Sequence, residues 1–504
     1  MSLLAIDMGS SSCKAVVYAV DGRILAETAL PYTSNTSLPS RTELPADVFW
    51  QTFRQATTHA SHATVSDPIE AIGISSHGET FAPVDDKNQP IAPAILNMDD
   101  RAVVQADLLK RRFDPKRIFE ITGLTVHPMY PLPKILWMRE HQPDVFAGTR
   151  RLLPVTSYLL ARLGVQPCVD YSLASRFLAF DVRRKEWSAE ILEACELDDG
   201  LFPTVVPAGT VAGELASGIA MELGLPAGTP IIVGGHDQPC AALGMGAIEP
   251  GRVSASLGTY ECLLVSSREP AINQDAYAAN LNTYCHVVPD RYVTLAYFPA
   301  GIMLEWFLGL FRDEWHGQGY TIDSICPSWE SGVSAGPSRL LISPHLLGTC
   351  NPDFDPKASG VIVGLRPATS ASDIYQGILE GIACEFATMA KLLQRVAGNF
   401  RAVYVTGGGC RSKLGMKLRA ALSGCRLHRT SSSDAVCLGT AILAGFGAGT
   451  YKSIPQTVER LVRVIDTEEP DLNIAATYRD YVRRYHLLYG SLANLRASSS
   501  INGF

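Results

Sequence analysis

The feature that most constrains this chain is a strand–turn–strand pattern that occurs twice, in its first and second halves. In the first copy an apolar run at 3–6 reaches Asp7, and a turn of one glycine and three serines leads through Lys14 into a second apolar run. In the second copy, VSASLGTYECLLV at 253–265, an apolar run passes through small hydroxylated residues and a glycine into another apolar run. Runs rich in valine and tyrosine that are bounded by such turns are typical of strands.

Neither turn has the spacing of the common phosphate loops, GxxxxGK[ST] and GxGxxG, which open a helix. A turn of hydroxyls and backbone N–H groups can nevertheless bind phosphate, and a nearby carboxylate can hold Mg²⁺ through water. Asp7 is therefore a candidate metal-site residue, and Ser10, Ser11 and Lys14 are candidate phosphate ligands. The alternative is an ordinary hairpin with a serine-rich bend, in which Lys14 is a solvated charge.

Apolar runs typical of strands alternate with helical patterns along the chain, which predicts an α/β architecture. Strands are predicted at 71–75, 152–154, 230–233, 253–256 and 403–406, and helices at 45–62, 133–141, 372–396 and 412–422. The two polar turns suggest two similar domains that close on one nucleotide, with a boundary between Gly235 and Gly251. We predict an N-terminal domain over 1–247 and a C-terminal domain over 248–504.

Composition and charge narrow the class of protein. The chain is 47% hydrophobic and 18% charged, as folded proteins are, and its net charge of -7 gives no electrostatic footprint for nucleic acid. We see no secretory signal, and the apolar stretch at 435–451 is too short and glycine-rich to span a bilayer. The 12 cysteines form no C-x-x-C pair, which favours reduced thiols. We therefore expect a cytoplasmic enzyme that contacts neither membrane nor nucleic acid.

A series of short motifs resembles, in order, those of the FGGY family of carbohydrate kinases. They are DMGSSSCK at 7–14 (first phosphate loop), MYPLPKILWMREH at 129–141 (N-terminal signature), GGHDQP at 234–239 (catalytic segment), SLGTY at 256–260 (second phosphate loop), GVIVGLRPATSASDIYQGILEG at 360–381 (C-terminal signature), and TGGGCRS at 406–412 and DAVCLGTAILA at 434–444 (adenosine segments). Gly377 and the pair Tyr260-Glu261 depart from the family pattern, and the second departure leaves the detail of that loop open.

This resemblance covers nearly the whole chain. It implies an α/β fold in which two actin-like (ribonuclease H-like) ATPase domains flank a nucleotide and sugar cleft. The sugar would bind residues 1–247 and ATP would bind residues 248–504.

Asp237 is the candidate catalytic base. It follows the apolar run at 231–233 through two glycines, so a strand can deliver its carboxylate into a cleft. There it would accept the proton of an attacking hydroxyl, and the resemblance implies the same role. Without the flanking motifs, a helix N-cap at Asp237 would fit the residues about equally well.

The nucleotide is expected to contact both domains. The resemblance implies that Gly258 and Thr259 approach the phosphates, and a residue without Cβ permits that close approach. It also implies an adenosine pocket built from small residues: Gly407, Gly408, Gly409, Ser412 and Gly439. The alternatives are a flexible strand-to-helix turn for the three glycines and close helix packing for Gly439.

The substrate is expected to bind polar residues that follow predicted strands: His77, Gly78, Glu79, Asp99, Arg101, Asp237 and Gln238. The His77-Gly78 pair resembles the His-Gly of the xylulokinase motif. Asp99 with Arg101 resembles the acid and arginine that follow a strand in xylulokinases. Glu79-Thr80, however, resembles the Glu-Thr of glycerol kinases, with Gly78 in place of their preceding arginine. His77 as a satisfied core histidine is the alternative, and Asp100 is expected to be solvated.

These features predict an ATP- and Mg²⁺-dependent kinase that phosphorylates a sugar hydroxyl, with D-xylulose to D-xylulose 5-phosphate as the leading reaction. Another ketose such as ribulose, a sugar acid, or a polyol such as glycerol is the alternative substrate. An alternative of another class is an actin-like ATPase that acts as a chaperone or a sugar sensor. A homodimer fits the family, although no apolar stripe identifies an interface.

Overall fold

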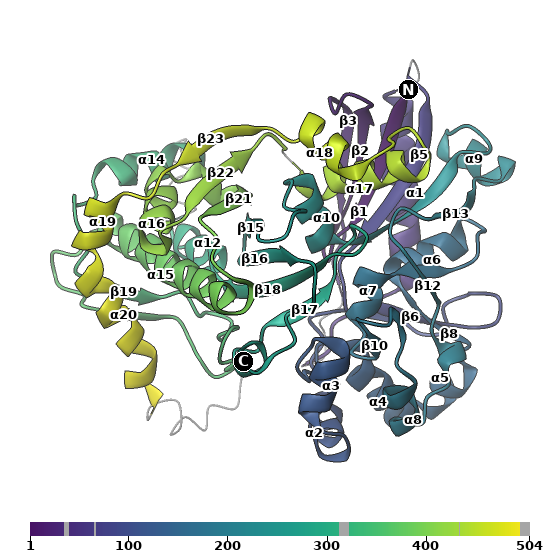
Figure 1. Cartoon of the computed structure of the whole chain (residues 1–504), viewed down its shortest axis with the longest axis horizontal. Helices are drawn as coiled ribbons and strands as arrows, with labels where there is room; N and C mark the ends of the chain where they lie inside the picture. The colour runs from purple at the N-terminus through teal and green to yellow at the C-terminus, as the bar shows by residue number, and fades with distance from the viewer. Residues whose placement is uncertain (35–39, 65–66, 312–321, 433, 494–504) are drawn as a thin grey trace.

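The structure is a computed structural model that describes residues 1–34, 40–64, 67–311, 322–432 and 434–493 (Figure 1). One large sheet comes from the N-terminal part of the chain and another from the C-terminal part, and helices surround both. Each helix and strand predicted above is present, with ends that differ by a few residues.

The first large sheet has the strand order β13-β14-β5-β1-β2-β3. Its strands are β1 (Ser2–Met8), β2 (Ser12–Ala19), β3 (Ile24–Pro31), β5 (Ile69–Ser76), β13 (Val211–Glu214) and β14 (Pro230–His236). β1 is buried along its whole length, which its apolar run allows. Because β1 runs parallel to β5 and β5 runs parallel to β14, the carboxyl ends of these strands meet at one edge.

The second large sheet has the order β17-β18-β16-β15-β21-β22-β23. Its strands are β15 (Val253–Leu257), β16 (Tyr260–Ser267), β17 (Asn282–Cys285), β18 (Tyr292–Pro299), β21 (Ala402–Thr406), β22 (Arg426–Thr430) and β23 (Val464–Glu468). β15 and β16 form the second predicted hairpin, with Gly258 and Thr259 at its turn. β15 is parallel to β21, so this turn lies at the same edge as the glycines that follow β21.

Smaller sheets complete the strands. They are β4 (Glu43–Leu44), β7 (Ala94–Ile95), β6 (Phe81–Val84) and β8 (Arg151–Pro154) in one sheet, and the pairs β10 (Phe180–Asp181) with β11 (Glu186–Trp187), β12 (Thr204–Val206) with β9 (Cys168–Asp170), and β19 (Leu341–Ser343) with β20 (Val361–Val363). Of these short strands, β19 packs against the long helix α15, and β9 packs against β14 of the first large sheet.

Helices cover the sheets. In the first half of the chain they are α1 (Ala46–His62), α2 (Val103–Arg112), α3 (Pro115–Thr122), α4 (Pro131–His141), α5 (Pro143–Gly148), α6 (Val155–Arg162), α7 (Tyr171–Ser175), α8 (Ala189–Ala194), η1 (Asp199–Leu201), α9 (Ser217–Leu223) and α10 (Asp237–Gly244). In the second half they are α11 (Gln274–Ala278), α12 (Gly301–Gly309), α14 (Ile322–Ser331), α15 (Ala371–Ala397), η2 (Gly408–Arg411), α16 (Lys413–Ser423), α17 (Ala435–Gly447), α18 (Ile454–Leu461), α19 (Leu472–Thr477) and α20 (Arg479–Ser491). α15 begins with a capping box between Ser370 and Asp373 and packs against β18, β19 and α16.

The helix α17 belongs to the C-terminal part of the sequence but packs on the first sheet. It contacts β1, β5 and β14 as well as α10, and its apolar side chains share one core cluster with Leu3 and Ile232. The chain therefore passes from the first sheet to the second before β15 and returns to the first sheet at α17. The predicted domain boundary at 247/248 lies near the first of these crossings, and it stays a prediction.

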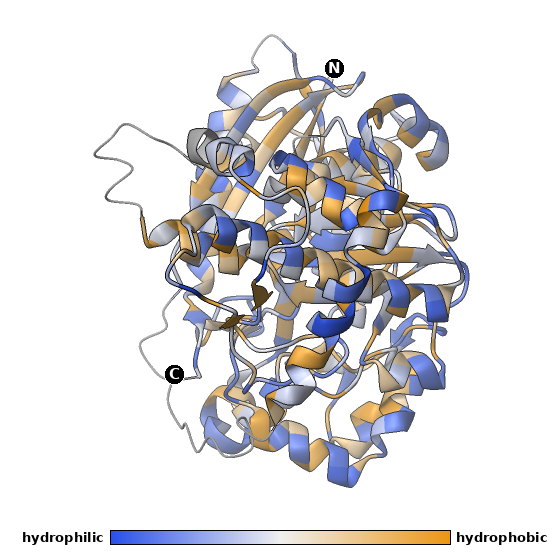
Figure 2. Ribbon diagram, turned by 90° about the vertical axis from the view of Figure 1, so that its left-hand side faces the viewer, coloured by the Kyte–Doolittle hydropathy of each residue, from blue (hydrophilic) through white to orange (hydrophobic). Residues whose placement is uncertain are grey.

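The cores lie where the sheets meet their helices. Figure 2 shows many apolar residues on the strands and a mixture of polar and apolar residues along the surrounding helices. The apolar strand residues are largely buried. One cluster of buried apolar side chains lies under the C-terminal helices, and another lies between α1 and the first sheet. The edge at which the strands of the first sheet end is the place where polar side chains gather.

Candidate active site

Two carboxylates stand at the edge where the central strands of the first sheet end. Asp7 lies near the end of β1, and Asp237 is the first residue of α10, directly after β14. The N-cap of α10 is His236, and no side chain caps the helix. Asp237 therefore follows a strand end as predicted and does not act as the N-cap that was the alternative.

The Asp237 carboxylate is poised to accept a proton. Its Oδ1 is buried and has no hydrogen-bond partner in the described part of the chain. His236 Nε2 lies 3.2 Å from it, but burial lowers the pKa of His236 well below its ordinary value, so that ring is neutral. Burial raises the pKa of the Asp237 carboxyl to about 7, and the negative charge of Glu79 adds to the rise. A carboxylate with this pKa suits a general base near neutral pH.

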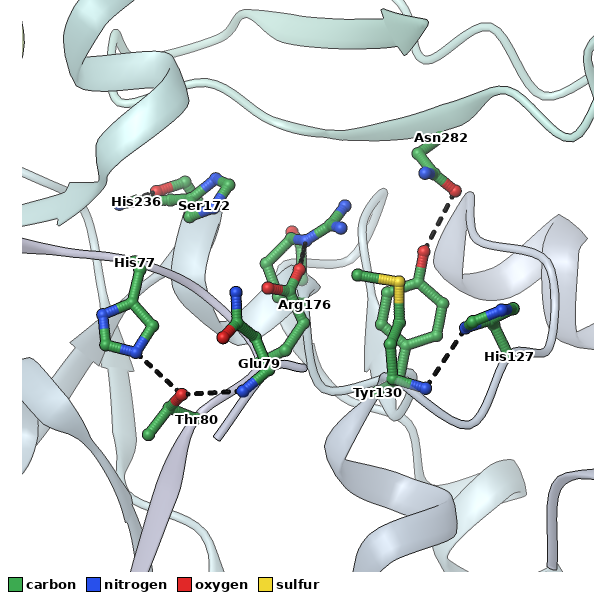
Figure 3. Close-up of polar contacts among 12 residues, drawn as sticks. His77, Glu79, Thr80, His127, Tyr130, Ser172, Arg176, His236 and Asn282 are labelled. Atoms are coloured by element: carbon green, nitrogen blue, oxygen red, sulfur yellow. Dashed lines mark hydrogen bonds and ion pairs between the residues drawn. The ribbon is translucent and has the colours of Figure 1, made fainter. Parts of the chain in front are cut away.

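Arg176, which the sequence analysis missed, lies close enough for its positive charge to lower the pKa of the Asp237 carboxyl. Figure 3 shows Arg176 beside Glu79. Its Nε donates to Glu79 Oε1 at 2.5 Å, and their side chains are 3% and 6% exposed. The guanidinium carbon lies 5.2 Å from the ring centre of Tyr130 and 4.7 Å from that of Tyr284. Glu79 has a φ of 63°, a conformation that non-glycine residues adopt rarely and that often occurs at functional sites.

Gly78 makes room for this arrangement. A Cβ at position 78 would lie 2.9 Å from His236 Nε2 and 3.1 Å from Arg176 Cγ. A side chain at this position would push both groups away from Asp237. Gly78 thus shapes the site through its lack of a side chain, whereas Gln238 is half-buried in the first turn of α10.

Several buried polar atoms in this region have no hydrogen-bond partner within the described ranges. They are Arg176 Nη1, His236 Nδ1, Asp237 Oδ1, Asn282 Nδ2 and Tyr284 Oη. Buried polar groups are nearly always paired in folded proteins, so a cluster of unpaired ones calls for a polar ligand. A small molecule rich in hydroxyls and carbonyl oxygens would satisfy it.

His77, a predicted substrate residue, makes hydrogen bonds within the protein. Its Nδ1 lies 2.8 Å from the Met8 carbonyl oxygen, and its Nε2 lies 2.8 Å from Thr80 Oγ1. Thr80 Oγ1 in turn accepts from the Asn97 N–H at 3.1 Å. This chain assigns Nδ1 as the donor and Nε2 as the acceptor, and burial lowers the pKa of the ring. Both ring nitrogens are thus engaged within the protein, as in the core-histidine alternative. Figure 3 shows the contact with Thr80. A substrate role for His77 stays a prediction.

Asp99 and Arg101, the next predicted substrate residues, are paired with each other, and their binding of substrate stays a prediction. Asp99 is fully buried and accepts two hydrogen bonds from the Arg101 guanidinium, at 2.8 and 2.7 Å. It also accepts from the backbone N–H groups of Thr42 and Arg101. Arg101 pairs further with Glu43 and stacks on Trp137. The Arg101 Nη1 is buried without a hydrogen-bond partner in the described part of the chain, and the other contacts of the pair hold the loop after β7. Asp100 is exposed, as expected.

The first polar turn lies open beside Asp7. Ser10 and Ser11 are exposed, so their hydroxyls can reach a ligand. Lys14 Nζ lies 2.7 Å from Asp434 Oδ2, and Asp434 also caps α17 through the Cys437 N–H. Lys14 is therefore paired with Asp434 and is not the free, solvated charge of the alternative. Asp434 is a candidate site residue that the sequence analysis missed.

The second polar turn is equally open. Gly258 and Thr259 are exposed, and the hydroxyl of Thr259 donates to Glu305 at 3.3 Å. α12 starts against this turn, since the Gly301 N–H donates to the Gly258 carbonyl at 3.1 Å. A Cβ at Gly301 would lie 2.5 Å from that carbonyl oxygen, so the glycine permits the contact.

The three glycines after β21 pass close to the second polar turn. Gly407 has a φ of 102°, and a Cβ there would lie 2.7 Å from the Leu257 carbonyl oxygen. Gly408 has open space around it, and Gly409 lies against Leu257. The Ser412 hydroxyl makes two hydrogen bonds within the protein: it caps α16 by accepting from the Gly415 N–H, and it donates to Glu330 at 2.6 Å.

Gly439 lies inside a helix crossing and not on an open pocket. A Cβ at Gly439 would lie 1.9 Å from the Cys240 carbonyl oxygen, and a Cβ at Gly244 would lie 1.9 Å from the Ala435 carbonyl oxygen. The two glycines let α10 and α17 touch backbone to backbone. The packing alternative that the sequence left open therefore describes Gly439.

A buried ion pair joins the second polar turn to the helix after the three glycines. Arg419 in α16 donates through Nε to Glu261 Oε2 at 3.1 Å and through Nη2 to Oε1. Both residues are 2% exposed. Glu261 is one of the positions at which the chain departs from the family pattern, and its partner could not be found from sequence spacing.

One missed residue had a signal in the sequence. Arg176 stands alone among apolar neighbours in SLASRFLAF at 172–180, and arginine is almost never fully buried unless it is paired. Asn282 and Tyr284 had no such signal, because they alternate with unremarkable residues on a strand of the other half.

Comparisons with known proteins identify the family and the fold. The N-terminal and C-terminal domain models of the FGGY family of carbohydrate kinases match residues 2–244 and 253–448. A xylulose kinase from Staphylococcus epidermidis is 27% identical over 508 residues, 98% of each chain. A gluconokinase from Bacillus subtilis is 23% identical over 462 residues, 90% of this chain and 88% of that protein. The structure of a xylulose kinase from Lactobacillus acidophilus covers 99% of each chain with a TM-score of 0.89 at 21% identity.

The predicted α/β fold of two actin-like ATPase domains is confirmed, and membership of this kinase family implies the use of ATP. None of the helices in the described ranges is long and apolar enough to cross a bilayer. The family models together match most of the sequence, from the first strand to α17. The chain belongs to the FGGY family of carbohydrate kinases.

Proposed function

We propose that this kinase transfers the γ-phosphoryl group of ATP to the 5-hydroxyl of D-xylulose. Similarity to a xylulose kinase over nearly the whole chain supports the substrate. The observation that carries the catalytic part is Asp237, a carboxylate with an unpartnered buried oxygen and a pKa of about 7. It stands beside unpaired polar groups that suit a sugar.

Asp237 acts as the general base in this proposal. As the sugar oxygen bonds to the γ-phosphorus and the bond to the leaving oxygen of ADP breaks, the hydroxyl proton passes to Asp237 Oδ1. Assistance of this kind is typically worth about 10²- to 10⁴-fold in rate. The Glu79–Arg176 pair fixes the sugar against this carboxylate: the free oxygen of Glu79 accepts from a hydroxyl and Arg176 Nη1 donates to an oxygen.

Asp7 is the proposed residue for Mg²⁺. Burial raises the pKa of Asp7, and the negative charges of Asp237 and Asp434 raise it further, so a cation beside it would relieve repulsion. No three ligating side chains of the described segments are arranged to hold a metal alone. This fits Mg²⁺, which is commonly held by one or two carboxylates, water and substrate phosphates. When bound, Mg²⁺ would neutralise charge on the phosphates.

The polar turns and the glycines after β21 are the proposed ATP contacts. Ser10, Ser11, Gly258 and Thr259 are exposed, and the two turns carry backbone N–H groups that suit phosphate. Gly408, in open space, suits the flat approach of adenosine. Ser412 and Gly439 are left out of this proposed set, since Ser412 caps α16 and Gly439 packs against α10.

A coupled assay of ADP release tests the proposal. Purified protein with ATP and Mg²⁺ is offered D-xylulose, D-ribulose, glycerol and D-gluconate in parallel. The expected result is the highest kcat/KM with D-xylulose. Highest turnover with D-gluconate would favour the sugar-acid alternative that the gluconokinase relative raises, and no turnover across the panel would favour a chaperone or sensor.

A further inference from the structure

A strand of the second sheet reaches into the sugar site of the first half. β17 is an edge strand that pairs with β18, and its other edge is docked on the N-terminal half. The Thr283 N–H donates to the Gly123 carbonyl at 2.9 Å. A Cβ at Gly123, whose φ is 70°, would lie 2.1 Å from the Thr283 carbonyl oxygen, so the contact is backbone on backbone. β17 is thereby held against the half of the chain that carries Asp237.

The side chains on either side of Thr283 point into the site. Residues 282 and 284 share one face of the strand because side chains alternate. Asn282 is 1% exposed, and its Oδ1 accepts from the Tyr130 hydroxyl at 3.1 Å. Burial raises the pKa of Tyr130 to about 12, so this hydroxyl keeps its proton to donate. The contact fixes the orientation of the amide, and Nδ2 is turned toward Arg176 (Figure 3).

Three hydrogen-bond donors on Arg176 and the residues around it lack partners in the described part of the chain. Asn282 Nδ2, Tyr284 Oη and Arg176 Nη1 are all buried and unpaired within the residues that the structure describes. Arg176 lies over the Tyr284 ring and also over the ring of Tyr130, which bonds to Asn282. Two of these groups donate only, and the third can do so. Such a set selects an oxygen that accepts hydrogen bonds.

The chemistry of a 2-ketopentose supplies such an oxygen. Its furanose ring closes through the 5-hydroxyl onto C2, so a sugar in the ring form has no free 5-hydroxyl to phosphorylate. A kinase acting at O5 must hold the open chain, in which C2 is a carbonyl that only accepts. A carboxylate would fit less well, because Glu79 balances the charge of Arg176 and Asp7 and Asp237 are nearby.

We propose that Asn282, Tyr284 and Arg176 bind the C2 carbonyl of an open-chain ketose, so that the second half of the chain sets the preference for ketoses. This inference rests on the proposed phosphorylation of D-xylulose and adds the residues that select its open-chain form. Asn282 and Tyr284 are the specificity residues, since Arg176 also anchors Glu79.

The test combines kinetics with the ¹³C resonance of bound sugar. Asn282→Asp keeps the oxygen that Tyr130 needs and replaces the donor Nδ2 by an acceptor. We expect it to lower kcat/KM for D-xylulose by about tenfold or more, as the loss of a buried partner does, with the ATP KM unchanged. Asn280→Asp is the matched control, because the Asn280 amide nitrogen already donates to Pro352, and it should change neither value.

With D-[2-¹³C]xylulose, the bound C2 signal is expected in the carbonyl region, downfield of the free open-chain sugar, and Asn282→Asp should remove that displacement. A bound signal in the hemiketal region, or one that the substitution does not move, would overturn the inference while turnover stands. Absence of both bound signal and turnover would overturn the proposed function itself. If Asn282→Asp does not fold, Tyr284→Phe decides: it keeps the ring against Arg176, and an unchanged kcat/KM and C2 signal would contradict the proposal. Tyr481→Phe, in the distant helix α20, is its control.

Discussion

Lys14 Nζ lies 2.7 Å from Asp434 Oδ2, although 420 positions separate the two residues in the chain. The pair joins the strand after the first polar turn to the first turn of α17. Asp434 also raises the pKa of Asp7, so the pair lies next to the proposed Mg²⁺ site. The contact thus ties the returning C-terminal helix to the part of the first sheet that is to face the phosphates.

The two partners are expected to differ in their effect on ATP. Lys14→Ala removes a proposed phosphate ligand and should raise the ATP KM about tenfold, with the sugar KM unchanged. Asp434→Asn keeps a capping side chain on α17 and frees Lys14, so it should change the ATP KM less than about threefold. Steady-state kinetics with ATP varied at saturating D-xylulose decide. Equal effects of both substitutions would mean that Lys14 serves the ion pair alone.

The buried pair of Glu261 and Arg419 is expected to support both stability and the second phosphate turn. Glu261→Gln leaves a buried arginine without its counter-charge, which costs about 3–5 kcal/mol of unfolding free energy. Urea unfolding measures this loss, and the ATP KM should rise because Glu261 follows the turn. Replacing both residues, by Glu261→Leu with Arg419→Met, should cost less than Glu261→Gln alone. A double variant that is less stable than the single one would contradict this account of the pair.

Thr80 is expected to contribute to the stability of the fold through the hydrogen bonds of its hydroxyl. Thr80→Val preserves shape but removes the hydroxyl that links His77 Nε2 to the Asn97 N–H. Leaving these buried groups unpaired should lower the unfolding free energy by about 1–3 kcal/mol. Thr57→Val is the control, since Thr57 Oγ1 is buried without a partner in the described chain. That substitution should be neutral, and equal losses in thermal unfolding would refute the hydrogen-bond argument.

Local patterns in the sequence were sufficient to predict the α/β class and the named helices and strands, whereas the actin-like fold was predicted from the family resemblance. β1 and β14 are buried apolar runs that end at polar or glycine residues, and α15 opens with Ser370 and Asp373 at capping-box spacing. Such signals lie within a few residues, so one sequence carries them. The return of α17 to the first sheet was not predictable in this way, because it depends on contacts between segments far apart in the chain.

Only part of the site was predicted, because local patterns do not reveal contacts between segments far apart in the chain. Asp237 follows a strand end, which a local pattern reveals. Whether a polar side chain faces a ligand or another residue depends on distant partners: Asp99 turned out to be closed on Arg101, and His77 on Met8 and Thr80. Asn282 was missed because β17 belongs to the other half of the chain.

The pH dependence of activity should follow Asp237. A general base works when deprotonated, and the pKa of Asp237 is raised by burial to about 7. kcat/KM for D-xylulose should therefore fall about tenfold per pH unit below 7 and level off above it. Stopped assays from pH 5 to 9 at saturating ATP measure the profile. A flat profile between pH 5 and 7 would exclude Asp237 as the base.

The stability of the fold should depend on pH in the opposite direction to activity. The folded-state pKa of Asp237, about 7, lies above the ordinary aspartate value of 3.8, so the folded protein binds an extra proton between these pH values. The carboxylate thus destabilises the fold as pH rises toward 7, by at most about 4 kcal/mol at 1.4 kcal/mol per pKa unit. Asp237→Asn should raise the melting temperature at pH 8 and leave it nearly unchanged at pH 4, by differential scanning fluorimetry. A lower melting temperature at pH 8 would mark Asp237 as structural.

Turnover of Asp237→Asn tests the central claim most directly. Asparagine keeps the size of the side chain and cannot accept the hydroxyl proton, so kcat with D-xylulose should fall by about 10²- to 10⁴-fold. Binding of ATP, measured by calorimetry on the same preparation, should stay within about threefold of the unmodified protein because Asp237 faces the sugar. A folded Asp237→Asn protein that phosphorylates D-xylulose at the original rate would contradict the claim that this carboxylate is the base.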